Sequence, residues 1–183
     1  MKRKKGDKES NKKIYDMIAR YALALVLSIN SLLIFYYVFR PLTFFPVVFI
    51  LKLIYPVKAS GIDSMIIGGK GISFVNSCIA GSAYYLFSVL NLSTPGISWI
   101  KRMKIFMINS SALLMINISR IILLAIILVN ISEIFDTTHF IFWTFLSTIF
   151  VAGIWILTMR FYRIKSVPII SDVIYLKKLI KKS

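Results

Sequence analysis

The stretch that most constrains this chain is residues 72–92, ISFVNSCIAGSAYYLFSVLNL, which contains no charged side chain. A bilayer hydrocarbon core about 30 Å thick needs roughly 20 apolar residues in a helix that rises about 1.5 Å per residue. The run therefore predicts a transmembrane helix. It carries the only cysteine of the chain, Cys78, followed by small residues at 80–83. Small residues let a neighbouring helix approach closely.

The composition places the whole chain in the membrane class. Its 183 residues are 58% hydrophobic, and the mean hydropathy is +0.80, both above the range of soluble domains. The net charge of +16 comes mainly from the two tails and one internal loop, which favours a lipid surface and argues against nucleic acid. A single cysteine excludes an internal disulfide, and no His/Cys spacing or glycine-rich motif indicates a metal or a nucleotide cofactor.

The apolar runs predict an all-α integral membrane protein, a polytopic bundle of four full spans. The predicted spans are residues 21–39, 72–92, 105–129 and 140–159. Residues 41–55 are also apolar but short, with Pro41, Pro46 and Lys52, which is typical of a re-entrant or interfacial segment. The glycine-rich residues 56–71 are predicted to form a loop.

The predicted domain organisation has three parts. Residues 1–13 form a basic cytoplasmic tail, and residues 14–159 form a single membrane domain. Residues 160–183 form a basic amphipathic cytoplasmic tail that lies along the membrane surface. Lysine and arginine favour the cytoplasmic side. Four spans keep both tails and the basic flank 101–104 there. A fifth crossing by residues 41–55 would move that flank and the C-terminal tail outside, so the charge pattern favours four.

This topology brings three chemically distinct side chains to the outer leaflet, Cys78, Arg120 and His139. An arginine inside a span costs about 2.5 to 3.5 kcal/mol on insertion scales, so it needs a partner or a role. Asn117 lies one turn before Arg120, on nearly the same helical face. Asp136 lies one turn before His139 and is a candidate to orient its ring.

These residues match the needs of cysteine acyl transfer. Cys78 is the candidate nucleophile, Arg120 would stabilise a thiolate or an oxyanion, and His139 would carry the proton. Each also has a structural interpretation. The cysteine is then inert packing, the arginine extends to the interface, and the histidine is simply solvated.

The order of motifs resembles that of the exosortase and archaeosortase family of membrane-embedded cysteine transpeptidases. NSCIAGS around Cys78 is similar to the cysteine segment of that family, and INISRI, ending in Arg120-Ile121, is similar to its Asn-x-x-Arg-Ile signature. His139 opens the next apolar run, where exosortases place their third residue. The resemblance covers about residues 73–155 and identifies the chain as a short member.

The resemblance implies an enzyme of the cell membrane with its site on the extracytoplasmic side. Its partners would be the C-terminal sorting signals of exported surface proteins, which it would cleave and transfer through a Cys78 thioester to a lipid or envelope acceptor. The alternative is a non-enzymatic membrane subunit or assembly factor that uses Arg120 and Asn117 for helix pairing. A transporter ranks last, because the polar residues cluster toward one face of the bilayer.

Overall fold

The computed structural model describes residues 2–142, 144 and 147–180 of the chain, and these are mostly helical. The helices are α1 (Lys2–Ser28), η1 (Ile29–Leu32), α2 (Leu33–Lys52), α3 (Asn76–Ile79), α4 (Gly81–Leu92), α5 (Trp99–Asn130), η2 (Ser132–Ile134), α6 (Phe135–Ile141), α7 (Ser147–Phe161) and α8 (Ile170–Ile180). The strands are β1 (Val57–Ser60), β2 (Ser64–Ile67) and β3 (Lys70–Ser73).

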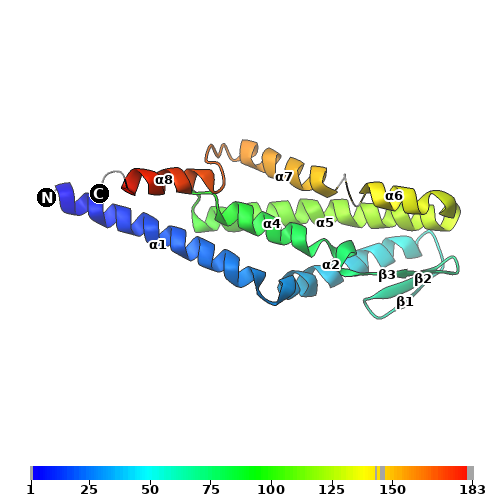
Figure 1. Ribbon diagram of the computed structural model, residues 1–183. Helices are drawn as coiled ribbons and strands as arrows, with labels where there is room; N and C mark the ends of the chain where they lie inside the picture. Colours follow the sequence, from blue (N-terminus) through cyan, green and yellow to red (C-terminus); the bar gives the residue numbers. More distant parts are fainter. Residues whose placement is uncertain (1, 143, 145–146, 181–183) are drawn as a thin grey trace.

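The helices form an elongated bundle along α5 (Figure 1). The small sheet and the turn between α5 and α6 lie at one end, and α8 and the turn between α4 and α5 lie at the other. We call these the sheet end and the basic end. The loops predicted to share one side of the membrane therefore share one end of the molecule.

Two helices of the described chain, α2 and α5, are long and apolar enough to cross a membrane. The prediction of four unbroken spans is thus wrong. Of the four predicted segments, residues 105–129 are helical throughout, inside α5. Residues 21–39 are divided by η1, where Leu32 has a left-handed backbone with φ 64°.

The segment 41–55, predicted as a separate short segment of re-entrant or interfacial type, is not separate, because its first twelve residues continue α2. Pro41 and Pro46 both lie inside this helix. Proline is tolerated in membrane helices where neighbouring groups satisfy the backbone carbonyls that it leaves free. The chain instead bends before α2, at η1.

Residues 72–92 also depart from a single helix. They begin in β3, pass through the short α3 and change direction at Ala80, whose φ of 58° is left-handed, before α4 begins. The predicted loop at 56–71 contains most of a three-stranded antiparallel sheet. Its strands are only four residues long. Burial alternates along β2, where Met65 and Ile67 are buried and Ile66 is exposed, but all three residues are apolar, so the sequence shows no alternation.

The predicted span 140–159 is described as two helices, α6 and α7. Residues 143, 145 and 146 of that span lie outside the described residues. α7 is apolar but, at 15 residues, shorter than a bilayer requires. Whether α6 and α7 join into one span therefore lies outside the described residues.

The core is built where α2 and α4 pack against α5. Tyr84, Phe87 and Ile105 are fully buried there. The ring of Phe39 stacks on that of Tyr84 with centroids 3.5 Å apart, which joins α2 to α4. Burying side chains of this size contributes about 1.5 to 3 kcal/mol each.

A buried ion pair holds the basic end together. Arg20 of α1 is 2% exposed, and it donates to both carboxylate oxygens of Asp172 of α8, at 3.0 and 3.1 Å. It also donates to the carbonyl of Leu92 at the end of α4, at 2.9 Å. Removing one partner of a buried pair leaves an uncompensated charge, so these contacts fix α8 against α1 and α4.

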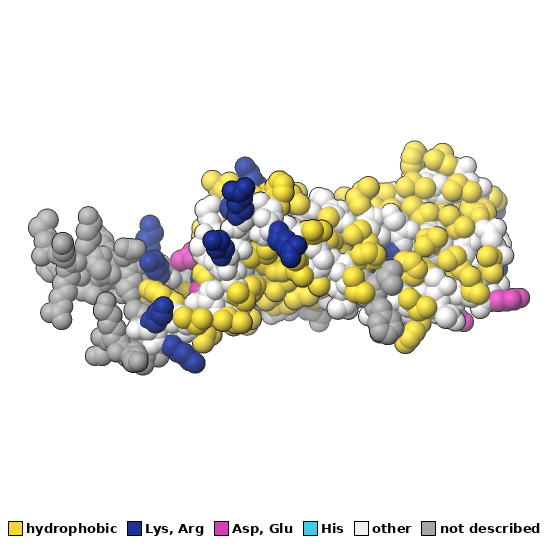
Figure 2. Space-filling model, turned by 90° about the horizontal axis from the view of Figure 1, so that it is seen from above, with side chains coloured by type: hydrophobic (Ala, Val, Ile, Leu, Met, Phe, Trp, Pro, Cys, Tyr) yellow, Lys and Arg dark blue, Asp and Glu magenta, His cyan; other side chains and the backbone are white. Residues whose placement is uncertain are grey.

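The outer surface is largely apolar, as Figure 2 shows for the face that carries α6, α7 and α8. Lysine and arginine gather near the basic end of this face. On α8 and just before it, hydrophobic side chains stand about half exposed, namely Ile169, Ile170, Val173 and Ile174. This pattern agrees with membrane association, which the two long apolar helices also indicate.

Substitution of Gly81 should destabilise the bundle. A Cβ at position 81 would lie 2.7 Å from Cζ of Tyr36, which is closer than real Cβ contacts come. We expect Gly81→Ala to lose about 1 to 3 kcal/mol through overpacking, measured by thermal unfolding in detergent. Gly153→Ala is the matched control, because a Cβ added at position 153 would meet nothing within 4 Å. Equal melting temperatures for the two variants would contradict the α2–α4 packing.

Candidate functional site

The cysteine predicted as nucleophile lies on α3, a single helical turn near the sheet end. Its thiol is partly exposed. The turn is held from α5, because Asn117 donates through Nδ2 to the carbonyl oxygen of Cys78 at 2.7 Å. Asn117 is itself 3% exposed, so this hydrogen bond is made inside the bundle. The predicted supporting role of Asn117 thus has a concrete geometric counterpart.

The same turn is held from α2. Arg40 donates to Oδ1 of Asn76 at 2.8 Å and forms an ion pair with Asp63 in the turn between β1 and β2. These contacts place the sheet beside α3. Sequence reasoning missed Arg40, which follows the predicted first span and looked like an ordinary charged flank. From the sequence alone, an arginine at the end of an apolar run gives no indication of which residue it will pair with.

Arg120 on α5 lies within electrostatic range of the Cys78 thiol. Its Nη1 donates to Oγ of Ser147, the first residue of α7, at 2.9 Å. That hydroxyl in turn donates to the carbonyl of Phe142. Ser147 was not predicted, because the sequence placed it in the middle of the span 140–159, where it had no visible partner.

The guanidinium of Arg120 keeps unused hydrogen-bonding capacity. Its Nε is buried and has no hydrogen-bond partner among the described residues. No salt bridge joins Arg120 to a carboxylate in the described part of the chain either. A buried donor without a partner is costly, and it is available to a group that enters the site.

His139 is not brought to this cluster. It lies exposed on α6, where its ring stacks on that of Phe135 with centroids 5.7 Å apart. Asp136, its predicted orienting partner, is exposed on the same short helix. Of the three predicted catalytic residues, the described structure therefore joins Cys78 and Arg120 and leaves His139 apart.

The backbone beside the thiol is strained. Ala80, two residues after Cys78, has a left-handed conformation that costs a non-glycine residue about 1 kcal/mol or more. The contacts from Asn117 and Arg40 hold the turn in place despite this cost. Strained backbone of this kind is concentrated at functional sites.

No group of three or more potential metal ligands is found among residues 2–142, 144 and 147–180. The chemistry offered by the cluster is that of a thiol, a cation and neutral hydrogen-bonding groups. Burial raises the pKa of the Cys78 thiol above its usual value, and the backbone hydrogen bond with Val75 and the charge of Arg120 act against this rise. An unpartnered N–H beside the thiol suits an oxyanion. Together these groups fit nucleophilic attack on a carbonyl.

Comparison with protein-family models, with curated proteins and with solved structures finds no match for this chain. The resemblance to the exosortase and archaeosortase family therefore stays a prediction from the motifs around Cys78 and Arg120. Its consequences are taken up as a proposal below.

Removing the amide that holds the cysteine turn should destabilise the site. We expect Asn117→Leu to lose about 1 to 3 kcal/mol of unfolding free energy, because the Cys78 carbonyl loses its buried donor. Chemical unfolding in detergent micelles measures this loss. Asn130→Leu is the control, since Asn130 also lies on α5 but donates its hydrogen bonds, to the Tyr55 hydroxyl and the Ile126 carbonyl, at the exposed surface. A loss no larger for Asn117→Leu than for the control would show that the hydrogen bond does not hold α3.

Proposed function

We propose that this chain is a membrane cysteine transpeptidase of the exosortase and archaeosortase type. Cys78 attacks the scissile carbonyl of a C-terminal sorting signal on an exported surface protein. The peptide C–N bond breaks, the C-terminal segment leaves as an amine that takes up the thiol proton, and the rest of the protein is held as a Cys78 thioester. A nucleophile of a lipid or envelope component then attacks this thioester, which releases Cys78 and completes the transfer.

One observation carries the proposal, namely that the cation next to the thiol is free of carboxylate partners among the described residues. Arg120 is hydrogen-bonded to the neutral hydroxyl of Ser147, and its Nε is unpartnered. A guanidinium already neutralised by Asp or Glu would stabilise a thiolate or an oxyanion far less. The buried Arg20, which is paired with Asp172, shows the opposite arrangement in the same molecule.

The proposed location is the cell membrane, with the sheet end extracytoplasmic. Supporting this orientation, the basic residues gather toward the opposite end, in line with the bias of Lys and Arg for the cytoplasm. α2 and α5 supply the membrane-crossing helices of the proposal. Cys78 then faces the compartment in which exported proteins arrive.

His139 is the proposed proton carrier, with Asp136 as the residue that orients it. His139 is exposed, its ring stacks on Phe135 of the same helix, and no hydrogen bond between it and Cys78 is found among the described residues. The role therefore requires α6 to shift toward α3 when a substrate binds, or a bridging water. Either the shift of α6 or the bridging water would let His139 accept the Cys78 proton, so no other proton acceptor is needed.

The alternative, a non-enzymatic membrane subunit, finds less support. It needs Asn117 and Arg120 to pair with helices of another protein. Asn117 already has a partner inside the chain, the Cys78 carbonyl. Arg120 is bound through Nη1 to the Ser147 hydroxyl, which leaves its Nε as the one buried polar atom of the two side chains without a partner among the described residues. Polar groups satisfied internally offer little to a second protein.

The proposal is tested by the masses of cell-envelope proteins in the organism that encodes the chain. We expect Cys78→Ala to cause surface proteins to keep a C-terminal hydrophobic segment that the parent strain removes, with Arg120→Ala giving the same products. Arg160→Ala is the control, because that arginine is exposed on α7, far from the thiol. If the Cys78 variant accumulates normally and its envelope proteins match those of the parent, Cys78 is packing and the transpeptidase is excluded.

A further inference from the structure

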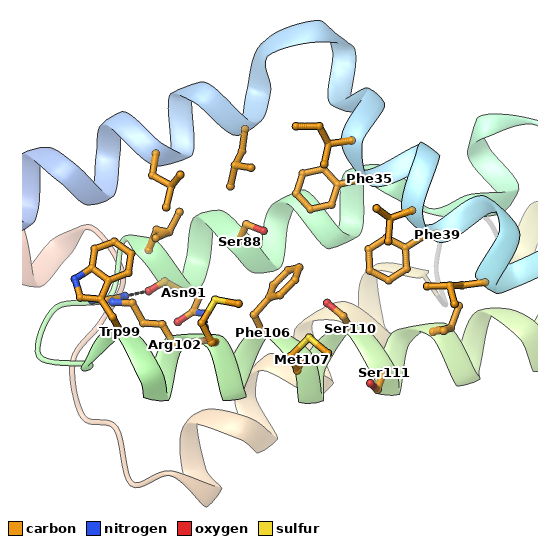
Figure 3. A pocket seen from close by; sticks show the side chains of 18 residues that line it. Phe35, Phe39, Ser88, Asn91, Trp99, Arg102, Phe106, Met107, Ser110 and Ser111 are labelled. Carbon is orange, nitrogen blue, oxygen red and sulfur yellow. Dashed lines mark hydrogen bonds between the residues drawn. The ribbon is translucent and has the colours of Figure 1, made fainter.

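An apolar groove of about 610 Å³ runs along α5, between that helix and the bend that joins α1 to α2 (Figure 3). The hydrophobic part of its lining comes from α1, α2 and α5, and includes Leu27, Phe35, Phe39, Met107 and Leu114. α4 contributes Ser88 and Asn91. The groove exists because α1 and α2 are separate helices that meet at a bend. A single straight helix in their place would have no bend and so would leave no room for the groove.

The groove is chemically different at its two ends. Toward the sheet end it is closed by apolar side chains such as Phe39 and Leu114. Toward the basic end it is lined by Trp99 and Arg102, whose guanidinium lies 5.8 Å from the centre of the indole ring. Tryptophan and basic residues mark the depth of lipid headgroups in membrane proteins.

Three buried polar atoms around the groove have no hydrogen-bond partner in the described structure. They are Oδ1 of Asn91, Nε of Arg102 and Oγ of Ser110. Each of these side chains is at most 4% exposed and lines the groove. Buried polar atoms are nearly always satisfied, so this set calls for a ligand with polar as well as apolar parts.

The charge of Arg102 is also not cancelled by a direct partner. The hydrogen bonds recorded for its guanidinium go to the backbone carbonyls of Asn91 and Thr94. The two carboxylates within electrostatic range, Asp16 and Asp172, are both paired with Arg20. A positive charge at the polar end of an apolar groove complements an anionic headgroup joined to a hydrocarbon chain.

We propose that the groove binds one anionic phospholipid of the cytoplasmic leaflet, with an acyl chain along α5 and its phosphate at the Arg102 end. A helix is a poorer occupant. From Trp99 to Leu114 the groove follows about 22 Å of α5, and a helix 10 Å across would fill roughly 1,700 Å³ over that length. Most of such a helix would stand outside a 610 Å³ groove, whereas a hydrocarbon chain is far thinner.

The inference rests on the membrane location proposed above, but not on the chemistry of Cys78. The headgroup would lie at the Arg102 end of the groove. Leu114, at the other end, is one turn before Asn117, the residue that is hydrogen-bonded to Cys78, so the headgroup lies at the end away from the thiol. A bound lipid of this kind would therefore support the bend between α1 and α2 and would not serve as the acceptor of the reaction.

The test is native mass spectrometry of the full chain released from detergent after incubation with dioleoylphosphatidylglycerol or dioleoylphosphatidylcholine. We expect one phosphatidylglycerol per chain, retained about fivefold or more over phosphatidylcholine, as one basic residue near an anionic headgroup provides. Arg102→Gln should abolish this preference. Ser111→Phe should abolish retention by filling the groove, because the exposed Ser111 lines it.

Ser119→Phe is the matched control, since Ser119 is an exposed serine on the same helix outside the groove. Retention that is unchanged in Ser111→Phe, or equal for the two lipids in the wild-type chain, overturns the proposal. A native mass that corresponds to a dimer without bound lipid also overturns the proposal. None of these outcomes alters the envelope masses that test Cys78, so the two proposals fail separately.

Discussion

Two polar side chains within an apolar helix, Asn117 and Arg120 on α5, impose the constraint on which the site depends. In a bilayer each must find a partner inside the protein, because lipid offers none. Asn117 takes the carbonyl of Cys78, and Arg120 takes the hydroxyl that begins α7. These two hydrogen bonds join α3 and α7 to α5. The thiol is thereby set beside the cation.

The two ends of the bundle use arginine in different ways. At the basic end Arg20 is enclosed and neutralised by Asp172, and its effect is to hold α1, α4 and α8 together. Near the sheet end Arg120 has a neutral partner and keeps an unused donor. The same side chain thus stabilises the fold in one place and remains available for chemistry in the other. What separates the two uses is whether a carboxylate lies within range.

The sequence was informative where a signal is local and poor where it depends on distant partners. Helical character and the apolar run in α5 follow from composition and length alone. The predicted direction of each segment placed Cys78, Arg120 and His139 together. The structure brings Arg120 within electrostatic range of Cys78, whereas His139 is exposed on α6. The break at Ala80 and the bend at Leu32 could not be read, since neither residue favours a left-handed backbone. Four-residue strands are also too short to show a clear period.

Hydropathy overestimated the number of spans for the same reason. An apolar run shows that a segment avoids water, but not that it forms one straight helix. In residues 72–92 the packing of Gly81 against Tyr36 and the contact of Asn117 with Cys78 decide where the chain turns. Arg40 and Ser147 were missed because both gain their meaning only from residues more than twenty positions away.

The most direct measurement is the rate at which Cys78, the single cysteine of the chain, reacts with a small uncharged alkylating reagent at neutral pH, followed by intact mass. If Arg120 promotes the thiolate, Arg120→Gln should slow alkylation by roughly tenfold, and Arg120→Lys should retain most of the wild-type rate. Melting temperatures measured in parallel show that the variants are folded. An Arg120→Gln variant that is folded and reacts as fast as the wild type would contradict a nucleophilic role for the Cys78–Arg120 pair.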